Sequence, residues 1–149
     1  MTGRLMRAMR VAGLGLALAA CTTTMAAKPP SLYQRLGGRE GIRGVVDDFV
    51  ATAVADDRIK GRFAGLQPAQ VEQLKTHLSD QICEATGGPC SYLGRDMKAT
   101  HRGMKISDEE WNATVEDLVK AMDKRKVAPQ DQQALLAVLG PMKGDIVGQ

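Results

Sequence analysis

Aromatic residues are scarce in this sequence, and charge of one sign is hardly in excess. Only five of the 149 residues are aromatic, namely Tyr33, Phe49, Phe63, Tyr92 and Trp111, so few large rigid side chains are available to fill a core. The formal charge of +3 comes from Arg4, Arg7 and Arg10, because the rest of the chain has 17 basic and 17 acidic residues. A nucleic-acid-binding protein needs clustered surplus positive charge, which this balance argues against. The length fits one compact domain.

Long apolar runs are also missing, which argues against a membrane-spanning helix of about 20 residues. The longest run, residues 11–20, follows three arginines and precedes Cys21, a pattern typical of an export signal. The stretch Leu18-Ala19-Ala20-Cys21 resembles a bacterial lipoprotein box, so Cys21 is expected to carry a lipid. Thr22 rather than Asp follows it, which favours sorting to the outer membrane. An ordinary cleaved signal with an incidental cysteine is the alternative.

This interpretation divides the chain into three parts. We expect residues 1–20 to be an export signal, 21–30 a polar tether that follows the lipid anchor, and 31–149 a folded domain in the periplasm. The two other cysteines, Cys83 and Cys90, would then lie in an oxidising compartment. The turn residues between them allow a disulfide, and a buried thiol at Cys83 is the alternative.

The folded part is predicted to be all-α. Apolar residues recur at helical spacing, and no strand-like alternation continues beyond four residues. We expect a capped turn over 31–36 and helices over 39–55, from Pro68 to the Gly87-Gly88-Pro89 break, over 95–103, from Ser107 and from Pro129. The helix from Pro68 is expected to bury a stripe of Val71, Leu74, Leu78 and Ile82. Gly140-Pro141 is expected to kink the last helix.

Histidine is rare as well, with His77 and His101 as the only two. They lie on consecutive predicted helices, beside the apolar residues Leu74 and Leu78 in the first and Met97 in the second. A lone histidine on such a face is more often a hydrogen-bonded core residue than a ligand. Two histidines on two helices, however, can supply an axial imidazole to each side of a planar haem iron. No Cys-x-x-Cys-His motif is present, so a haem would lack c-type thioether bonds.

Residues 31–147 resemble the group I truncated haemoglobins, which are short globins whose helices pack two over two around haem. The matching stretches are Leu-Tyr-Gln-Arg-Leu-Gly-Gly at 32–38, Asp-Asp-Arg-Ile at 56–59 with Phe63 after it, Gly87-Gly88, and Tyr-Leu-Gly-Arg-Asp-Met-Lys-Ala-Thr-His at 92–101. The resemblance implies an all-α truncated globin that binds one non-covalent haem b per chain.

The resemblance also implies roles for individual residues. His101 would be the proximal ligand, bonding iron through one ring nitrogen while the other donates to a nearby carbonyl. His77 occupies the position from which some relatives supply a sixth ligand. The remaining pocket residues would be Phe49, Phe63, Leu74 and Leu78, with Met97 on the proximal side and Arg95 or Lys98 beside a haem propionate. A solvated surface role for Arg95 and Lys98 is equally compatible with the sequence.

The distal side departs from the family pattern. Many relatives place a tyrosine after the phenylalanine of the second helix and glutamines on the distal helix, whereas this chain has Val50, Leu74 and Leu78. Loss of hydrogen bonds of about 0.5–1.5 kcal/mol each, or more to a charged ligand, should weaken oxygen retention roughly tenfold or more. The segment 141–144 lacks the histidine through which some relatives attach haem covalently.

Three functions are compatible with these features. The first is a lipid-anchored haem globin that binds oxygen, nitric oxide or carbon monoxide, and that could convert nitric oxide to nitrate. Such turnover needs an electron donor outside this chain, because no flavin or nicotinamide fingerprint is present. The second is a bis-histidine haem protein for electron transfer or redox sensing. The third is a haem-free helical lipoprotein with a structural role.

Overall fold

Helices make up all the regular structure of residues 28–149, the part of the chain that this computed structural model describes. The predicted export signal and Cys21 lie outside the described residues. The elements in chain order are α1 (Leu32–Arg35), α2 (Gly38–Ala53), η1 (Lys60–Arg62), α3 (Pro68–Ala85), α4 (Met97–His101), α5 (Asp108–Lys124), α6 (Pro129–Leu139) and η2 (Gly140–Asp145), where η1 and η2 are 3₁₀ helices. The all-α prediction is confirmed.

The helix starts follow the capping residues in the sequence. The Ser107 hydroxyl accepts from the Glu110 backbone N–H at 3.2 Å, and the Glu110 carboxylate accepts from the Ser107 N–H at 2.9 Å. Ser31 and Gln34 form the same reciprocal pair before α1. Proline occupies the first position of α3 and of α6, where its missing N–H removes no helical hydrogen bond.

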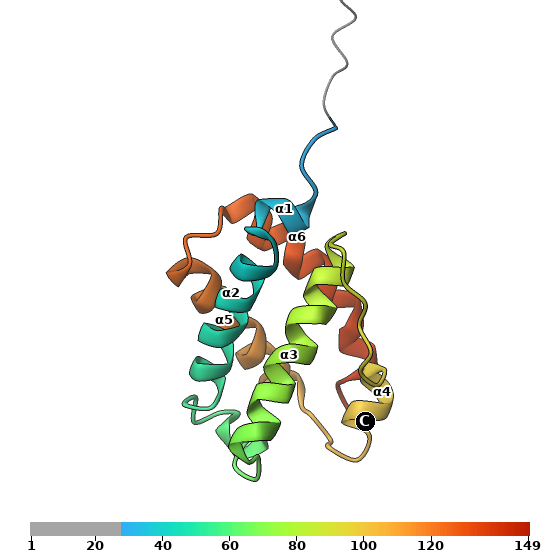
Figure 1. Cartoon of the computed structure of the whole chain (residues 1–149). Helices are drawn as coiled ribbons and strands as arrows, with labels where there is room; N and C mark the ends of the chain where they lie inside the picture. Colours follow the sequence, from blue (N-terminus) through green and yellow to red (C-terminus); the bar gives the residue numbers. More distant parts are fainter. Residues whose placement is uncertain (1–27) are drawn as a thin grey trace, which may run out of the picture.

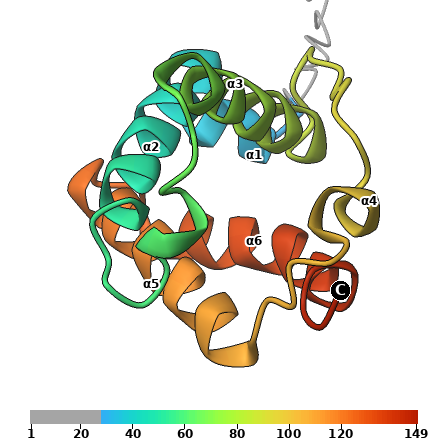
Figure 2. The same cartoon turned by 90° about the horizontal axis from the view of Figure 1, so that it is seen from below.

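The helices form two pairs, α2 with α3 and α5 with α6, around a common interior. In Figure 1, α2 and α3 run side by side, and α2 also packs against α5. Seen from below, α3 and α6 lie on opposite sides of the molecule, and α4 closes one end between them (Figure 2). No helix among the described residues is long and apolar enough to cross a membrane.

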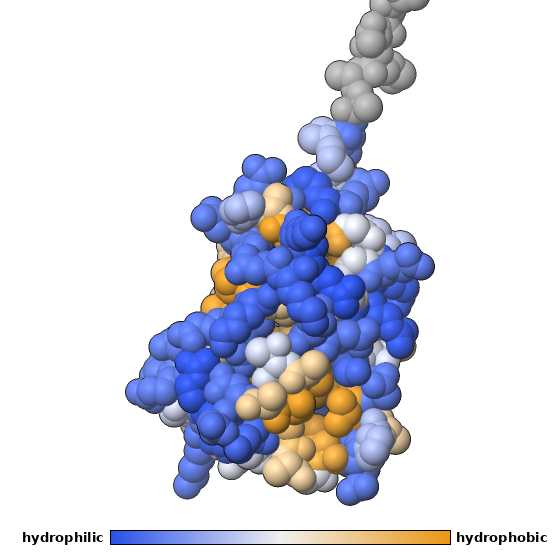
Figure 3. All heavy atoms as spheres, turned by 90° about the vertical axis from the view of Figure 1, so that its left-hand side faces the viewer, coloured by the Kyte–Doolittle hydropathy of each residue, from blue (hydrophilic) through white to orange (hydrophobic). Residues whose placement is uncertain are grey.

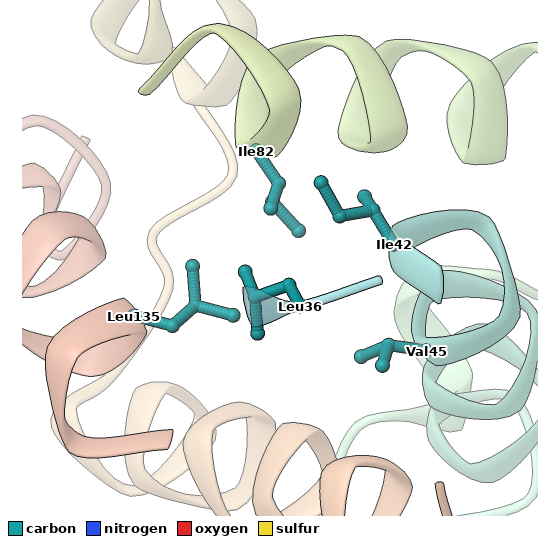
Figure 4. Close-up of a pocket in the computed structure, with 5 residues that line it drawn as sticks. All are labelled: Leu36, Ile42, Val45, Ile82 and Leu135. Atoms are coloured by element: carbon teal, nitrogen blue, oxygen red, sulfur yellow. The ribbon is translucent and has the colours of Figure 1, made fainter. Parts of the chain in front are cut away.

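The main core lies at the end of the domain where α1, α2, α3 and α6 meet. Ile42 and Val45 from α2, Ile82 from α3 and Leu135 from α6 point toward one another around Leu36 (Figure 4). All five are at most 5% exposed, and no space the size of a water molecule remains between them. This end of the fold is therefore a closed apolar contact between four helices.

Ion pairs fasten the outer side of α2 to α5. Asp48 contacts both Lys124, at 2.6 Å, and Arg125, at 2.5 Å, and these two cations lower the pKa of the Asp48 carboxyl. Arg58, in the loop after α2, reaches Glu116 of α5 at 2.7 Å. Most of the surface on this side is hydrophilic, and its largest apolar patch lies toward the lower end (Figure 3).

Two expectations about packing need correction. The α3 stripe is buried only at Ile82, which is 5% exposed, whereas Val71, Leu74 and Leu78 are half-buried. Gly140-Pro141 does more than kink the last helix, because the chain tightens there from α6 into the 3₁₀ helix η2. Proline has no N–H to continue the α-helical ladder, which accounts for the change.

Truncation of Leu135 tests the packing of the core. Leu135→Ala should lower the free energy of unfolding by about 2–5 kcal/mol, because a side chain that is 1% exposed leaves a cavity among rigid neighbours. Leu93→Ala is the matched control, since Leu93 is 88% exposed and should change stability by about 0.5 kcal/mol or less. Urea titrations of both variants measure the difference, and equal effects would contradict the packing described.

Candidate functional site

Helix α4 is short because local signals begin and end it within five residues. The Asp96 carboxylate accepts from the Ala99 N–H at 2.8 Å and so caps the first turn. At the other end Arg102 is extended, with φ −54° and ψ 125°, and Gly103 has a φ of 81°, a left-handed conformation that glycine adopts without strain. The helix therefore ends at His101, two residues before the predicted end at 103.

His101 lies in the last turn of α4 with its ring fixed by the backbone. Its Nδ1 lies 2.7 Å from the carbonyl oxygen of Met97, one turn earlier. A carbonyl oxygen can only accept, so Nδ1 is a protonated nitrogen, and the neutral form of the ring with this tautomer has its lone pair at Nε2. This arrangement, with one nitrogen donating to a carbonyl and the other free, is the usual one for a metal-binding histidine. The carbonyl partner expected for His101 is therefore that of Met97.

His77 lies on α3 in a half-buried position between Leu74 and Leu78. Its ring and the Tyr92 ring form a T-shaped contact, with centroids 6.1 Å apart and planes at 81°. Because Tyr92 belongs to the loop before α4, this contact links the helix that carries His77 to the segment that leads to His101.

The loop that carries Tyr92 is held at several points. Cys83, near the end of α3, and Cys90 form a disulfide with Cα atoms 5.8 Å apart, so the sequence alternative of a buried free thiol is not what the structure contains. The Tyr92 hydroxyl donates to the Arg95 carbonyl at 2.7 Å. Burial raises the pKa of this phenol, so it stays a donor at neutral pH. A Cβ at Gly94 would lie 2.3 Å from the Tyr92 oxygen, which explains the glycine there.

Phe49 and Phe63 are both half-buried. Phe49, from α2, packs against both apolar clusters of the domain, and Phe63 packs against the smaller one, formed by Ala53, Ile59 and Ala113. The preceding residue, Arg62, donates to both carboxylate oxygens of Glu110 in α5, at 2.6 and 2.8 Å. It also donates to the Met104 carbonyl at 2.8 Å. Arg62 thus ties the Phe63 loop to the segment after α4.

The chain end also holds the segment after α4. The Lys105 N–H donates to the Gln149 carbonyl at 2.6 Å, and the Gly148 N–H donates to the Ile106 carbonyl at 2.9 Å. Ile106 and Val147 form an isolated parallel bridge. Backbone hydrogen bonds therefore join the last residues of the chain to the segment that connects α4 to α5.

The side chains present fit a haem. Several apolar residues of α2, α3 and α4 are half-buried and keep part of their surface free for another group; they include Phe49, Leu74, Leu78 and Met97. His101 has a second ring nitrogen that the Met97 contact does not use. Arg95 and Lys98 are exposed and form no ion pair within residues 28–149, so both are free to meet a propionate. An apolar lining, an imidazole and cations at the rim are what a haem requires.

The structure brings some of the predicted residues together more directly than others. His77 is joined to the α4 segment through Tyr92, and Met97 is joined to His101 by its carbonyl. The roles of Tyr92 and Arg62 were not predicted from the sequence. Tyr92 belongs to a matching stretch but had no assigned function, and Arg62 acts through contacts 42 and 48 residues away in the sequence, which local patterns do not reveal.

Comparisons with known proteins agree on one family. Residues 31–147 match the family model described as bacterial-like globin. The group 1 truncated hemoglobin GlbN of a Nostoc species is 31% identical over 119 residues, which cover 80% of this chain and 98% of that protein. The corresponding protein of Mycolicibacterium paratuberculosis is 29% identical over 120 residues, covering 80% of this chain and 86% of its own length.

Solved structures share the fold. The Fe(III) form of truncated hemoglobin from Tetrahymena pyriformis superposes with a TM-score of 0.75 at 23% identity, covering 80% of this chain and all of that one. The 2/2 hemoglobin from a Synechococcus species, which has covalently attached heme, gives a TM-score of 0.72 at 26% identity, covering 79% of this chain and 98% of that one. The two-over-two arrangement of the helices is thereby established.

Removal of the Arg62 side chain tests how the Phe63 loop is held. Arg62 and the Ser107 N–H keep the pKa of Glu110 below its ordinary value, so this carboxylate stabilises the fold above pH about 4.3 and loses that effect as pH falls through its lowered pKa. Arg62→Ala should raise the Glu110 pKa and speed amide exchange across residues 58–66. Carboxyl NMR titration and hydrogen exchange measure both.

Arg43→Ala is the control for that substitution, because Arg43 is exposed and forms no ion pair within the described residues. It should leave the Glu110 titration and the exchange rates of the loop unchanged. If Arg62→Ala also leaves both unchanged, the ion pair does not hold the loop.

Proposed function

Because the chain belongs to the bacterial-like globin family, we propose that residues 31–147 hold one haem b without a covalent bond, with His101 as the proximal ligand. The observation that carries this assignment is the hydrogen bond between His101 Nδ1 and the Met97 carbonyl, which leaves Nε2 free. The bound haem would supply an iron centre that takes diatomic gases. Non-covalent binding rests on the absence of histidine from residues 141–144.

His77 is the proposed sixth ligand. The residues beside it on α3 are Leu74 and Leu78, and Val50 of α2 is 2% exposed and apolar. None of these three side chains can donate a hydrogen bond to a ligand. His77 therefore either ligates iron itself or is the donor that a bound gas would meet, and its ring contacts that of Tyr92 in the 90–95 loop.

The proposed ligands are oxygen and nitric oxide, with carbon monoxide as a probe. Turnover of nitric oxide and oxygen to nitrate consumes one electron for each nitrate formed. The sequence has no flavin or nicotinamide fingerprint to supply it, so turnover would require a separate electron donor.

A second candidate is electron transfer by a bis-histidine haem. The apolar residues at positions 50, 74 and 78 favour it, because a distal side with little polar character stabilises a bound gas poorly. The two candidates differ in whether an external ligand displaces His77.

The proposed location is the periplasm, with the domain anchored to the outer membrane by a lipid on Cys21. This proposal rests on the basic residues, the apolar run and the Leu18-Ala19-Ala20-Cys21 box of the N-terminal sequence. The Cys83–Cys90 disulfide supports it, because disulfides persist in oxidising compartments.

Optical spectra of histidine variants test the haem site. The wild type should be six-coordinate and low-spin when ferric and when ferrous. His101→Ala should lose its Soret band, whereas His77→Ala should keep haem, become five-coordinate and bind carbon monoxide about tenfold faster or more, because the competent state is no longer limited by ligand release. Gln73→Ala, an exposed neighbour on α3, should match the wild type.

The outcomes separate the candidates. A five-coordinate, high-spin ferrous wild type at neutral pH would contradict ligation by His77. A wild type that stays six-coordinate under carbon monoxide without binding it would favour electron transfer over gas binding. A purified protein without a Soret band after expression with added haem would contradict both.

The Cys21→Ala substitution tests the anchor. We expect full-length wild type expressed in a double-membraned bacterium to incorporate labelled palmitate and to sediment with outer membranes. Cys21→Ala should incorporate no label and leave the membrane fraction, because the thiol that accepts the lipid is gone. Cys83→Ala/Cys90→Ala should still be labelled; equal labelling of the Cys21 variant would contradict the anchor.

A further inference from the structure

A cationic segment surrounds α4 in a domain that is otherwise acidic. Between Glu84 and Asp108 there are four basic residues, Arg95, Lys98, Arg102 and Lys105, and one acid, Asp96. Residues 28–149 as a whole carry 17 basic and 17 acidic residues, so the rest of the domain has three more acids than bases. The equal numbers of acidic and basic residues in the domain therefore do not mean that charge is evenly distributed, because the α4 segment is basic and the rest is acidic.

The four cations are also free of protein partners. Ten of the 17 basic residues in the described part of the chain form ion pairs. Seven do not, and four of these seven are the exposed residues around α4. The single nearby acid, Asp96, is engaged as the cap of α4. Unpaired cations are therefore concentrated around α4, whereas most basic residues elsewhere in the domain form ion pairs.

An exposed leucine lies next to these cations. Leu93 is 88% exposed, and the only other exposed large hydrophobic side chain among residues 28–149 is Val54, at 40%. The loop that presents Leu93 is fixed by the Cys83–Cys90 disulfide and by the hydrogen bond from Tyr92 to the Arg95 carbonyl. Tyr92 faces His77, so Leu93 is displayed outward from a loop held at both ends. We call Leu93, Arg95, Lys98, Arg102 and Lys105 the proximal basic surface.

This surface lies directly outside the proposed proximal ligand. Lys98 lies in α4 three residues before His101, and Arg102 follows His101 directly, so both cations are close to the proposed ligand along the chain. Met97 and His101, spaced by four, share a face of α4 and are half-buried, whereas Lys98 and Arg102 are exposed. A partner docked on the cations would be separated from the haem by little more than α4.

We propose that the proximal basic surface docks an acidic protein that carries one electron, with Leu93 as its apolar contact. The proposal rests on the proposed haem function, which needs an outside reductant. In the transfer, one electron leaves the reduced partner and converts ferric haem iron to ferrous, so the partner is oxidised by one electron and no bond forms or breaks. Opposite charges on the two surfaces speed the encounter and orient it.

The position of the surface favours a protein partner over the anchoring membrane. The described chain begins beside α1, whereas α4 lies toward the opposite end of the domain (Figure 1). A tether that leaves near α1 would leave α4 turned toward the solvent of the compartment. An anionic lipid surface is the competing occupant and forms one arm of the test.

The test uses oxidised and reduced plant-type [2Fe–2S] ferredoxin as a defined acidic one-electron protein. Arg102→Glu/Lys105→Glu changes the proximal basic surface. The matched control is Arg43→Glu/Lys126→Glu, which makes the same change in net charge at two exposed, unpaired cations elsewhere and likewise alters one lysine with positive φ. Arg95 and Lys98 are left intact because a substitution at either residue would test a contact to a haem propionate as well as docking.

Residues 28–149 are produced with a cleavable export signal, so that the disulfide forms, and are loaded with haem. Reduction of this domain by ferredoxin is then followed in a stopped-flow instrument. We expect the surface variant to react about tenfold more slowly than the wild type at low salt and the control variant less than threefold more slowly, with both differences fading above about 0.1 M salt. Leu93→Ser should weaken binding severalfold with little salt dependence. Equal slowing by the two double variants would overturn the proposal.

A second measurement does not depend on haem. Amide NMR shifts of the domain titrated with oxidised ferredoxin should change around residues 93–105, and should do so without haem if the domain stays folded. Shifts confined to other elements, or shifts produced by phosphatidylserine vesicles but not by ferredoxin, would overturn it. The rate of haem reduction by dithionite should be equal in all variants. A domain that shows the NMR shifts but takes up no haem would refute the proposed haem function and still support the docking surface.

Discussion

The hydrogen bond between His101 and the Met97 carbonyl determines which ring nitrogen is free, and it exists only while α4 keeps its single helical turn. A five-residue helix is too short to be stable alone, so its attachments decide whether the site exists. Asp96 caps its start, the Cys83–Cys90 disulfide and Tyr92 hold the loop before it, and Arg62 grips the Met104 carbonyl after it. The C-terminus holds the next residues through Lys105 and Ile106.

The apolar side chains are buried unequally. The region around Leu36 and Leu135 is closed, whereas Phe49, Leu74 and Met97, the residues proposed to contact haem, are half-buried. The sequence has only five aromatic residues, and a haem would add a large flat aromatic body beside the half-buried residues. The free energy of unfolding should therefore be larger with haem bound than without it.

Local signals predicted most of the helices, and long-range contacts account for what they missed. Ser31, Pro68, Ser107 and Pro129 mark helix starts in the structure as they do in the sequence. Helical periodicity located the stripe of α3 but overestimated its burial, because periodicity identifies a face without revealing what covers it. The ion pair between Arg62 and Glu110 and the backbone hydrogen bond between Lys105 and Gln149 join segments 44 or more residues apart, which local patterns do not reveal.

The candidate ligands were predictable because histidine is so rare, and the resemblance over residues 92–101 assigned them distinct roles. Their support was not predictable. Tyr92 contacts His77 from a loop that the disulfide joins to the end of α3, and the sequence left the pairing of those cysteines open. The free cations around α4 were likewise hidden in a neutral total, since only the structure shows which charges are paired.

The most direct test of the central claim is a titration of the haem-free domain with haem, followed by both absorption and thermal unfolding. Saturation should occur at one haem per chain, and the melting temperature should rise with free haem, by an amount equivalent to about 2.7 kcal/mol when free haem reaches 100 times its dissociation constant. A domain that melts at the same temperature with and without haem, or that shows no saturable Soret band, would contradict the account.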